Sequence, residues 1–155
     1  MEKEFFVIVD NVRSLENVGS IFRTADAFGA TKIFLCGITG IPHGKGDKIS
    51  KTALGAEQWI PWEYHKQTWR VVEKMKRARV FIAALEQTSK SVPLDKFIPR
   101  FPLALVVGNE VEGVSSSVLE RADACVEIPM SGKKESLNVA VAFGIAAHAI
   151  ARYRN

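Results

Sequence analysis

The sequence predicts an α/β fold, in which helices flank a largely parallel sheet. Short apolar runs typical of buried strands alternate along the chain with longer segments of helical periodicity. The length of 155 residues suits one domain, and 47% of the residues are hydrophobic and 25% are charged, as in an ordinary globular protein. These values exclude a disordered chain, a collagen-like repeat and a coiled coil.

The strands are predicted from apolar runs that are bounded by polar or turn-forming residues. A continuous apolar run indicates a strand that is covered on both faces. We expect strands at residues 4–10, 32–37, 58–61, 80–85, 103–108 and 124–129.

The helices are predicted from 3.6-residue periodicity and from their end signals. Asn17 can cap the first helix, and Gly29 is placed to end it. The loop at 38–51 is rich in Gly, Lys and Pro, and the connector at 89–102 holds three prolines, so both are expected to be irregular. The expected helices are 17–28, a short one at 52–57, 69–79, a short one at 115–121, and 136–154.

The last helix is apolar on every side. Between Leu137 and Arg154, 13 of 18 residues are hydrophobic. A helix of this kind must be covered on every face, and in so small a chain one sheet covers only one of them. A symmetric subunit interface would cover the remainder. The alternative is a helix threaded deep into the core of its own chain.

Composition and residue spacing give no sign of a membrane protein, a secreted protein or a metal-binding protein. The chain lacks an apolar run long enough for a membrane span, and its N-terminus does not resemble a signal peptide. Cys36 and Cys125 lie in apolar runs and are expected to be core residues, and the three histidines lack metal-ligand spacing. We therefore expect a cytoplasmic protein without a metal. The formal net charge of +4 permits an anionic partner without establishing one.

Polar clusters follow three of the predicted strands, at residues 10–13, 108–110 and 128–136. Ligands of open α/β sheets bind beyond the carboxyl ends of the strands, which makes these clusters candidate site residues, although ordinary solvated turns have the same composition. The glycine-rich dinucleotide and triphosphate motifs and the G-x-S-x-G hydrolase motif are absent.

Arg23 falls on the polar face of the first predicted helix, opposite the apolar stripe of Val18, Ile21 and Phe22. It precedes Asp26 by three residues, the spacing of a helical ion pair. By spacing alone, Arg23 is either a solvated arginine with a weak surface pair or a functional cation.

Three segments together carry a family resemblance. Residues 17–30 (NVGSIFRTADAFGA) resemble the first motif of the SpoU (TrmH-like) branch of the SPOUT RNA methyltransferases. Residues 106–115 (VVGNEVEGVS) resemble the second motif, and residues 128–130 (IPM) with 136–142 (SLNVAVA) resemble the third. The three segments occur in the family's order and spacing and span nearly the whole chain.

The resemblance implies an S-adenosylmethionine-dependent enzyme that methylates a ribose 2′-OH of tRNA or rRNA. It also implies a deep C-terminal trefoil knot and a homodimer, and the dimer agrees with the apolar last helix. Residues 1–155 would form a single catalytic domain without a separate RNA-binding extension, so the catalytic domain or a partner protein would have to bind the RNA.

Carried over position by position, the family's motifs assign roles to residues of this chain. The expected catalytic residues are Asn17, Arg23, Glu110, Ser136 and Asn138. The expected cofactor-binding residues are Leu85, Glu86, Gly108, Ile128, Met130 and Leu137. The basic residues that we expect to contact RNA phosphates, or else to be plain solvated charges, are Arg13, Lys45, Lys48, Lys51, Lys133 and Lys134.

An arginine is a poor general base at neutral pH, because its pKa lies above about 12. Our hypothesis is that Arg23 holds the adjacent phosphate and stabilises the alkoxide that develops on the ribose. Asn17 and Asn138 would orient Arg23 and the ribose, Ser136 would hydrogen-bond near the methyl acceptor, and Glu110 would fix a loop across the dimer. Two other hypotheses stay open, an inactive RNA-binding homodimer of the same fold and an enzyme that acts on a small anionic metabolite.

Overall fold

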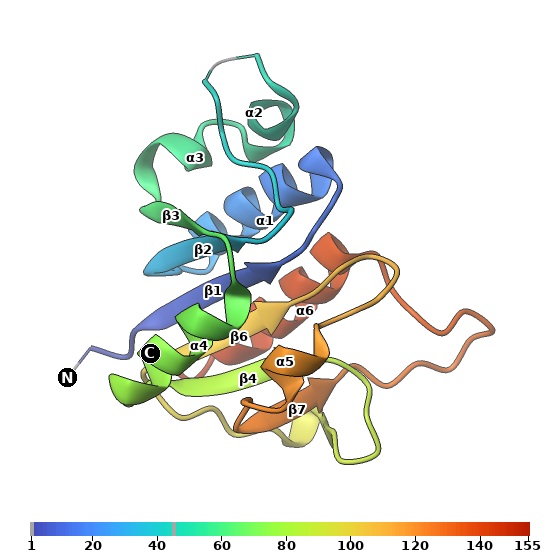
Figure 1. Ribbon diagram of the computed structural model, residues 1–155. Helices are drawn as coiled ribbons and strands as arrows, with labels where there is room; N and C mark the ends of the chain where they lie inside the picture. Colours follow the sequence, from blue (N-terminus) through green and yellow to red (C-terminus); the bar gives the residue numbers. More distant parts are fainter. Residues whose placement is uncertain (1, 45) are drawn as a thin grey trace.

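Seven parallel strands form one sheet in the computed structural model, which describes residues 2–44 and 46–155 (Figure 1). The strands are β1 (Phe5–Asp10), β2 (Lys32–Cys36), β3 (Trp62–His65), β4 (Phe81–Leu85), β5 (Val92–Pro93), β6 (Leu103–Val107) and β7 (Ala124–Glu127). Their order across the sheet is β3-β2-β1-β6-β4-β7-β5. Strand β6 thus lies between β1 and β4, and β7 lies between β4 and β5, although each inserted strand follows both of its neighbours in the sequence.

Helices cover both faces of this sheet. They are α1 (Leu15–Ala27), α2 (Lys48–Ala53), α3 (Ala56–Trp59), α4 (Thr68–Arg77), the 3₁₀ turn η1 (Leu94–Lys96), α5 (Ser116–Leu119) and α6 (Val139–Ala151). One buried cluster joins the sheet to α1, α2, α3 and α6, and a second joins its other face to α4 and α5 (Figure 1). The predicted α/β fold with a parallel sheet is therefore confirmed.

The first helix begins earlier than predicted. Ser14, not Asn17, is its N-cap, and the Ser14 hydroxyl accepts a hydrogen bond from the Asn17 amide at 3.2 Å. A serine hydroxyl is as good a cap as an asparagine amide. The amide side chain of Asn17 is therefore free for contacts elsewhere.

The segment between residues 38 and 65 differs most from prediction. Helix α2 begins at Lys48, inside the predicted loop, with Asp47 as its N-cap. A second short helix, α3, follows, and the strand that we expected at 58–61 lies at Trp62–His65. Gly19 explains why α2 packs tightly on α1, because a Cβ at Gly19 would collide with the Ile49 carbonyl and the Thr52 hydroxyl.

Two predicted boundaries near the C-terminus also move. Strand β7 ends at Glu127 rather than 129, and α6 begins at Val139 rather than 136. The connector at 89–102 is less irregular than expected, since it contains β5 and η1. Residues 128–138 consequently form one long loop that leaves the carboxyl end of β7 and returns to α6 (Figure 1).

Helix α6 is only half covered by its own chain. Phe143, Ala147 and Ile150 are fully or almost fully buried against the sheet and α1, whereas Val141 and Ile145 are 53% and 41% exposed. The alternative of a helix threaded wholly into its own core is therefore wrong for this chain.

The remaining composition-based expectations concern membranes, metals and cysteines. Cys36 is buried, Cys125 is half-buried, and both are free thiols. Burial raises the pKa of the Cys36 thiol to about 12, so it packs as a small apolar group. No helix within residues 2–44 and 46–155 is long and apolar enough to cross a bilayer. The same residues contain no group of three or more His, Cys, Asp or Glu side chains arranged to hold a metal ion.

Candidate active site

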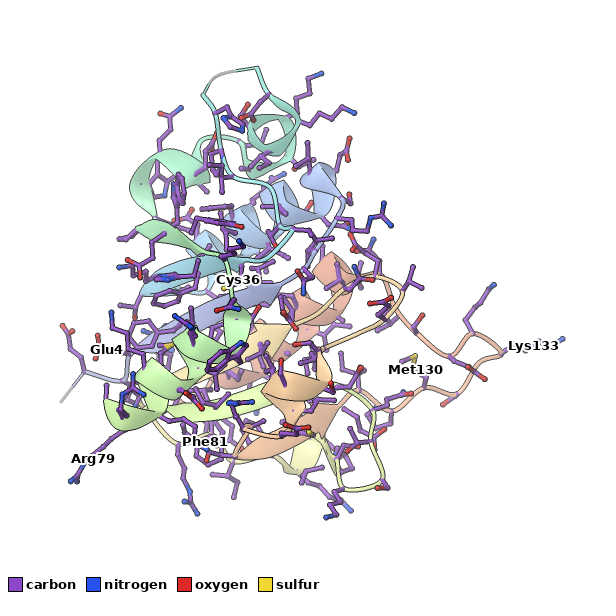
Figure 2. The ribbon with its side chains drawn as sticks, in the orientation of Figure 1. Glu4, Cys36, Arg79, Phe81, Met130 and Lys133 are labelled. Carbon is purple, nitrogen blue, oxygen red and sulfur yellow. The ribbon has the colours of Figure 1, made fainter. Side chains whose placement is uncertain are left out.

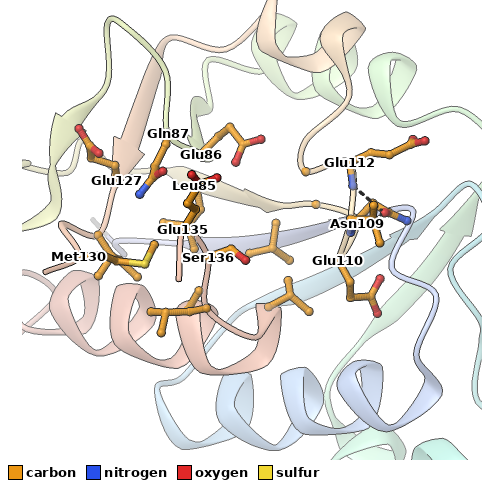
Figure 3. A pocket seen from close by; sticks show the side chains of 18 of the residues that line it. Leu85, Glu86, Gln87, Asn109, Glu110, Glu112, Glu127, Met130, Glu135 and Ser136 are labelled. Carbon is orange, nitrogen blue, oxygen red and sulfur yellow. Dashed lines mark hydrogen bonds between the residues drawn. The ribbon is translucent and has the colours of Figure 1, made fainter. Parts of the chain in front are cut away.

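A pocket opens at the carboxyl ends of β4, β6 and β7, where the sheet's parallel strands point toward one edge (Figure 3). The strand ends supply Leu85, Val107 and Val126 to its floor. Its walls come from the loop after β6, the long loop after β7 and the first turns of α6. Parallel α/β sheets bind ligands at this edge.

All six residues predicted to bind the cofactor line this pocket. They come from three separate parts of the sequence, and the strand order places those parts side by side. The six are Leu85, Glu86, Gly108, Ile128, Met130 and Leu137. Most of them are apolar, and a flat aromatic ligand can pack against such side chains while backbone groups hydrogen-bond to its edge.

The pocket is also acidic. Its described lining residues include five carboxylates and no lysine, arginine or histidine (Figure 3). Burial raises the pKa of the Glu86 carboxyl above its ordinary value, although backbone N–H groups of Val114 and Gln87 partly offset this effect. A cationic ligand is electrostatically favoured here, and an anionic one is disfavoured. The five carboxylates are Glu86, Glu110, Glu112, Glu127 and Glu135.

The loop after β6 is a tight backbone turn. Asn109 and Gly113 exchange two backbone hydrogen bonds of 3.0 and 2.9 Å, and the Asn109 side chain accepts from the amides of Val111 and Glu112. Gly113 has a φ of +73°, and a Cβ there would collide with the Glu86 carboxylate. The positive φ therefore favours a glycine at this position of the pocket wall.

Three of the predicted catalytic residues form one hydrogen-bonded network beside the pocket. The Asn17 side chain donates to Glu110 Oε2 at 3.1 Å, and the Asn138 side chain donates to Asn17 Oδ1 at 3.1 Å. Asn138 is also the N-cap of α6, with its Oδ1 accepting from the amides of Ala140 and Val141. The network thus joins the start of α1, the loop after β6 and the start of α6.

Glu110 is held by hydrogen bonds from its own chain, and its expected role across a dimer stays a prediction. Its two carboxylate oxygens accept from the backbone amides of Arg13 and Ser14 at 2.9 and 2.8 Å. Partial burial by itself would raise the pKa of Glu110, but these two hydrogen bonds and the one from Asn17 outweigh it, so the pKa is lowered. The carboxylate therefore stays ionised and fixes the approach to α1.

The other two predicted catalytic residues lie apart from this network. Ser136 is exposed on the loop before α6 and lines the pocket. Arg23 is exposed on α1 and lines a different surface groove with Ser20, Thr24 and Lys51. Within one chain, Arg23 is therefore not part of the pocket.

Arg23 does not pair with Asp26 as its spacing suggested. Asp26 instead accepts a hydrogen bond of 2.8 Å from the indole of Trp59 on α3. Among the residues that the structure describes, no salt bridge involves Arg23. The guanidinium is thus available to an anion outside its own chain.

The predicted RNA-contact residues occupy two loops and one helix. Lys133 and Lys134 are exposed on the long loop that borders the pocket, and Figure 2 shows Lys133 extending into solvent. Lys48 and Lys51 are exposed on α2, and Arg13 is exposed just before α1. Lys45 lies outside the described residues.

Two residues that shape the site belong to the predicted polar clusters but were given no role of their own. Asp10 is fully buried at the end of β1, where it accepts from the Thr68 hydroxyl at 2.6 Å and the Ser115 amide at 2.8 Å. Asn109 donates from its side chain to the Asn11 carbonyl at 2.8 Å. Their position at the carboxyl ends of buried apolar strands is the sequence signal that had marked both clusters as candidate site residues.

The fold and the site define the class of protein. It is a parallel α/β domain with an acidic, partly apolar pocket at the carboxyl edge of its sheet and a polar network beside it. The sequence model of the SpoU rRNA Methylase family matches residues 4–148, and the chain belongs to this family.

Individual relatives agree with this assignment. The chain is 33% identical over 154 residues to the tRNA (guanosine(18)-2′-O)-methyltransferase of Aquifex aeolicus, an alignment that covers 99% of this chain and 71% of that protein. Among solved structures, the AdoMet-bound rRNA methyltransferase of Sinorhizobium meliloti superposes with a TM-score of 0.88 at 32% identity, covering 99% of this chain and 57% of that one.

The relatives differ in length. This chain spans 61% of a Bacillus subtilis relative of the TrmH family, to which it is 33% identical over 154 residues. A structure that concerns the 2-OH methylation of C/U34 on tRNA is of nearly the same size. It superposes with a TM-score of 0.83 at 25% identity, covering 97% of this chain and 95% of that one.

Proposed function

We propose that the chain is the catalytic domain of an S-adenosylmethionine-dependent enzyme that methylates a ribose 2′-OH of tRNA or rRNA. The observation that carries this proposal is the meeting of two features at one edge of the sheet. All six residues expected to bind the cofactor line the acidic pocket, and the Asn17–Glu110–Asn138 network borders it. The RNA substrate would place this enzyme in the cytoplasm.

The chemistry of the pocket fits S-adenosylmethionine. Apolar side chains such as Leu85, Ile128 and Leu137 suit an adenine ring, and carboxylates suit the sulfonium and ammonium charges. When bound, the cofactor supplies an electrophilic methyl group. Glu86 and Glu127 are the half-buried carboxylates among the five, and Glu86, whose pKa burial raises, would contribute to the attraction of a cation when it is ionised.

The strand order supports a knotted path for the C-terminal half. Strands β6 and β7 lie between strands that precede them in the sequence, as threading through an earlier loop requires. We propose that the loops after β4, β6 and β7, which line the pocket, are the crossings of the family's deep trefoil knot. Residues 1–155 would then form a single catalytic domain around this knot.

A homodimer would complete the site. An apolar groove runs between α1 and α6 past Val141 and Ile145, and it shares Ser20, Thr24 and Phe28 with the groove that holds Arg23. A second copy that packs on this groove would cover the exposed side of α6. The same packing would carry Arg23 of one subunit toward the pocket of its partner.

In such a dimer, each of the predicted catalytic residues would have a distinct role. As a guanidinium cation, Arg23 would hold an RNA phosphate and stabilise the negative charge that develops on the ribose 2′-oxygen. Ser136, on the pocket wall, would donate a hydrogen bond near that oxygen. Asn17 and Asn138 would be positioning residues, since their hydrogen bonds fix the two helix ends that bring these groups together.

The direct test is mapping of 2′-O-methyl nucleotides by mass spectrometry in tRNA and rRNA from cells with and without the protein. We expect the loss of at least one ribose methylation in the deletion strain. Purified protein with S-adenosylmethionine should restore that mark in RNA from the same strain. An unchanged methylation map, together with no cofactor binding by calorimetry, would refute the proposal.

A further inference from the structure

Helix α4 and its flanks form the most basic stretch of the chain, and this stretch lies outside the proposed active site. Residues 66–79 hold one carboxylate, Glu73, and the six cations Lys66, Arg70, Lys74, Lys76, Arg77 and Arg79. Their formal charge is therefore +5, whereas the whole chain is +4, so that the rest of the chain sums to −1.

Within residues 2–44 and 46–155, most of these cations have no acidic partner. All six side chains are exposed. Lys76 is the one that is paired, since it donates to the Arg121 carbonyl at 2.7 Å and lies 3.6 Å from Asp123. In the part of the chain that the structure describes, the other five take part in no salt bridge. Figure 2 shows one of them, Arg79, pointing into solvent at the opposite end of the molecule from Lys133.

An aromatic ring orders two of the guanidinium groups on this face. The Arg70 and Arg121 guanidinium carbons lie 5.2 and 5.0 Å from the centre of the Trp69 ring. Arg121 is held further by a 2.9 Å ion pair with Glu73. A cation that is already ordered loses less side-chain entropy when it binds a ligand. Arg70 is therefore a prearranged contact for an anion.

Arg79 occupies a backbone position that favours glycine. It follows α4 with a φ of +65°, in the left-handed region, which costs a residue with a Cβ about 1 kcal/mol. Its amide donates to the Lys76 carbonyl at 2.9 Å, a bond that a glycine would also make. Since the described contacts give the side chain no partner, the fold alone does not explain an arginine here.

The chemistry of this surface points to a polyanion with regularly spaced charges. The apolar side of α4, with Val71, Val72 and Met75, is buried against the sheet and cannot enter a bilayer. The active-site pocket carries five carboxylates and repels phosphate, so an RNA substrate needs basic surface elsewhere. Exposed lysines and arginines beside an ordered guanidinium suit a nucleic-acid backbone.

We propose that α4, with Lys66 and Arg79 at its two ends, is a second RNA-contact surface that binds phosphates of the substrate away from the methylated nucleotide. The inference rests on the proposed function, since it assigns a surface to the same substrate. Helix α4 lies on the opposite face of the sheet from α1 and α6. It therefore stays accessible in a dimer that packs through the α1–α6 groove.

The test removes three of these charges without touching the pocket. The variant Lys74→Gln/Arg77→Gln/Arg79→Gly keeps the buried side of α4 and relieves the left-handed strain at residue 79, so its thermal midpoint should not fall by more than a few degrees. We expect its Kd for labelled unfractionated tRNA to rise about tenfold near 0.1 M salt. The slope of log K against log salt should decrease by about 2 to 3.

A matched control removes the same charge elsewhere. Lys90→Gln/Lys96→Gln/Arg100→Gln alters three exposed cations in the connector between β4 and β6. This variant should keep the wild-type salt slope and bind tRNA within about twofold to threefold of wild type. An equal loss in both variants, or wild-type affinity in the α4 variant, would overturn the proposal.

Two further measurements separate this inference from the proposed function. In methylation assays the α4 variant should raise KM for RNA and leave kcat and cofactor affinity unchanged. If wild type binds tRNA through α4 but methylates none, the inference holds and the proposed function fails. Binding to phosphatidylglycerol vesicles that depends on α4, with unchanged tRNA binding, would replace RNA by a membrane as the ligand.

Discussion

The pocket and the α1–α6 groove are built very differently. The pocket draws its floor and walls from one chain, and its loops are fixed by hydrogen bonds such as those of Asn109 and Glu110. The groove exposes the apolar side chains of Val141 and Ile145. In the adjacent groove along α1, the Arg23 guanidinium takes part in no salt bridge in the described parts of the chain.

This difference indicates which of the two steps, cofactor binding or methyl transfer, needs a second subunit. Under the proposed function, a single chain would bind the cofactor, because its own residues line the whole pocket. Under the proposed function, methyl transfer would also need the dimer, which would cover the α1–α6 groove and bring Arg23 from the adjacent groove to the partner's pocket. Cofactor binding and methyl transfer should therefore be separable by mutation.

The largest effect should come from the double variant Val141→Glu/Ile145→Glu. Two carboxylates on the exposed side of α6 would be buried in the proposed interface, at a cost of several kcal/mol. We expect a monomer by sedimentation, methylation below about 1% of wild type, and cofactor affinity within about twofold. A monomeric variant with full activity would remove the dimer from the mechanism. Ser89→Glu/Ser116→Glu adds the same charge at exposed positions and is the control.

Arg23→Lys should lower kcat about 100-fold and leave the cofactor Kd unchanged. Lysine retains the charge but not the planar fork of donors, and the loss of one transition-state donor costs about this much. Steady-state kinetics and calorimetry on the same preparation measure both quantities. If kcat stays near wild type, the guanidinium has no role in the reaction.

Substitution of Asn138 tests the network at the border of the two regions. Asn138→Ala removes the cap of α6 and should lower the free energy of unfolding by about 0.5–2 kcal/mol. Asn138→Ser keeps a capping oxygen but loses the donor to Asn17, so it should recover stability without recovering full activity. Urea unfolding and kcat measure the two effects, and a Ser variant with wild-type kcat would limit Asn138 to helix capping.

The smallest effect should be on cofactor affinity. Glu86→Gln removes a carboxylate of the pocket and should weaken S-adenosylmethionine binding about fivefold, or about 1 kcal/mol. Because the pKa of Glu86 is raised, its carboxylate takes up a proton at a higher pH than an ordinary glutamate does. As the pH falls, the affinity of wild type for the cofactor should therefore decrease at that higher pH. The Gln variant should lack that step. Glu112→Gln, at an exposed lining residue, is the control for calorimetry across pH.

The sequence predicted the long elements well because their signals are local. A continuous apolar run of five or six residues is buried wherever the sheet places it, as β1 and β6 are. The short elements between 38 and 65 escaped prediction. A four-residue helix or strand has little intrinsic stability, and its boundaries follow contacts such as that of Gly19 with α2.

The candidate site was predicted in its residues but not in its arrangement. The family resemblance implied six cofactor-binding candidates, and all six line the pocket. No local signal could show that Glu110 binds the amides of Arg13 and Ser14, which lie about a hundred positions earlier. Such pairing exists only once β6 lies beside β1.

By itself, therefore, the sequence determined the fold class, the family and the chemistry available at the strand ends. The tertiary structure decided which of those ends meet, that Ser14 rather than Asn17 caps α1, and that Arg23 lies outside its own chain's pocket. The physical reason is that apolar patterning and motifs act over a few residues. Hydrogen-bond partners and subunit faces depend on the order in which parallel strands lie side by side.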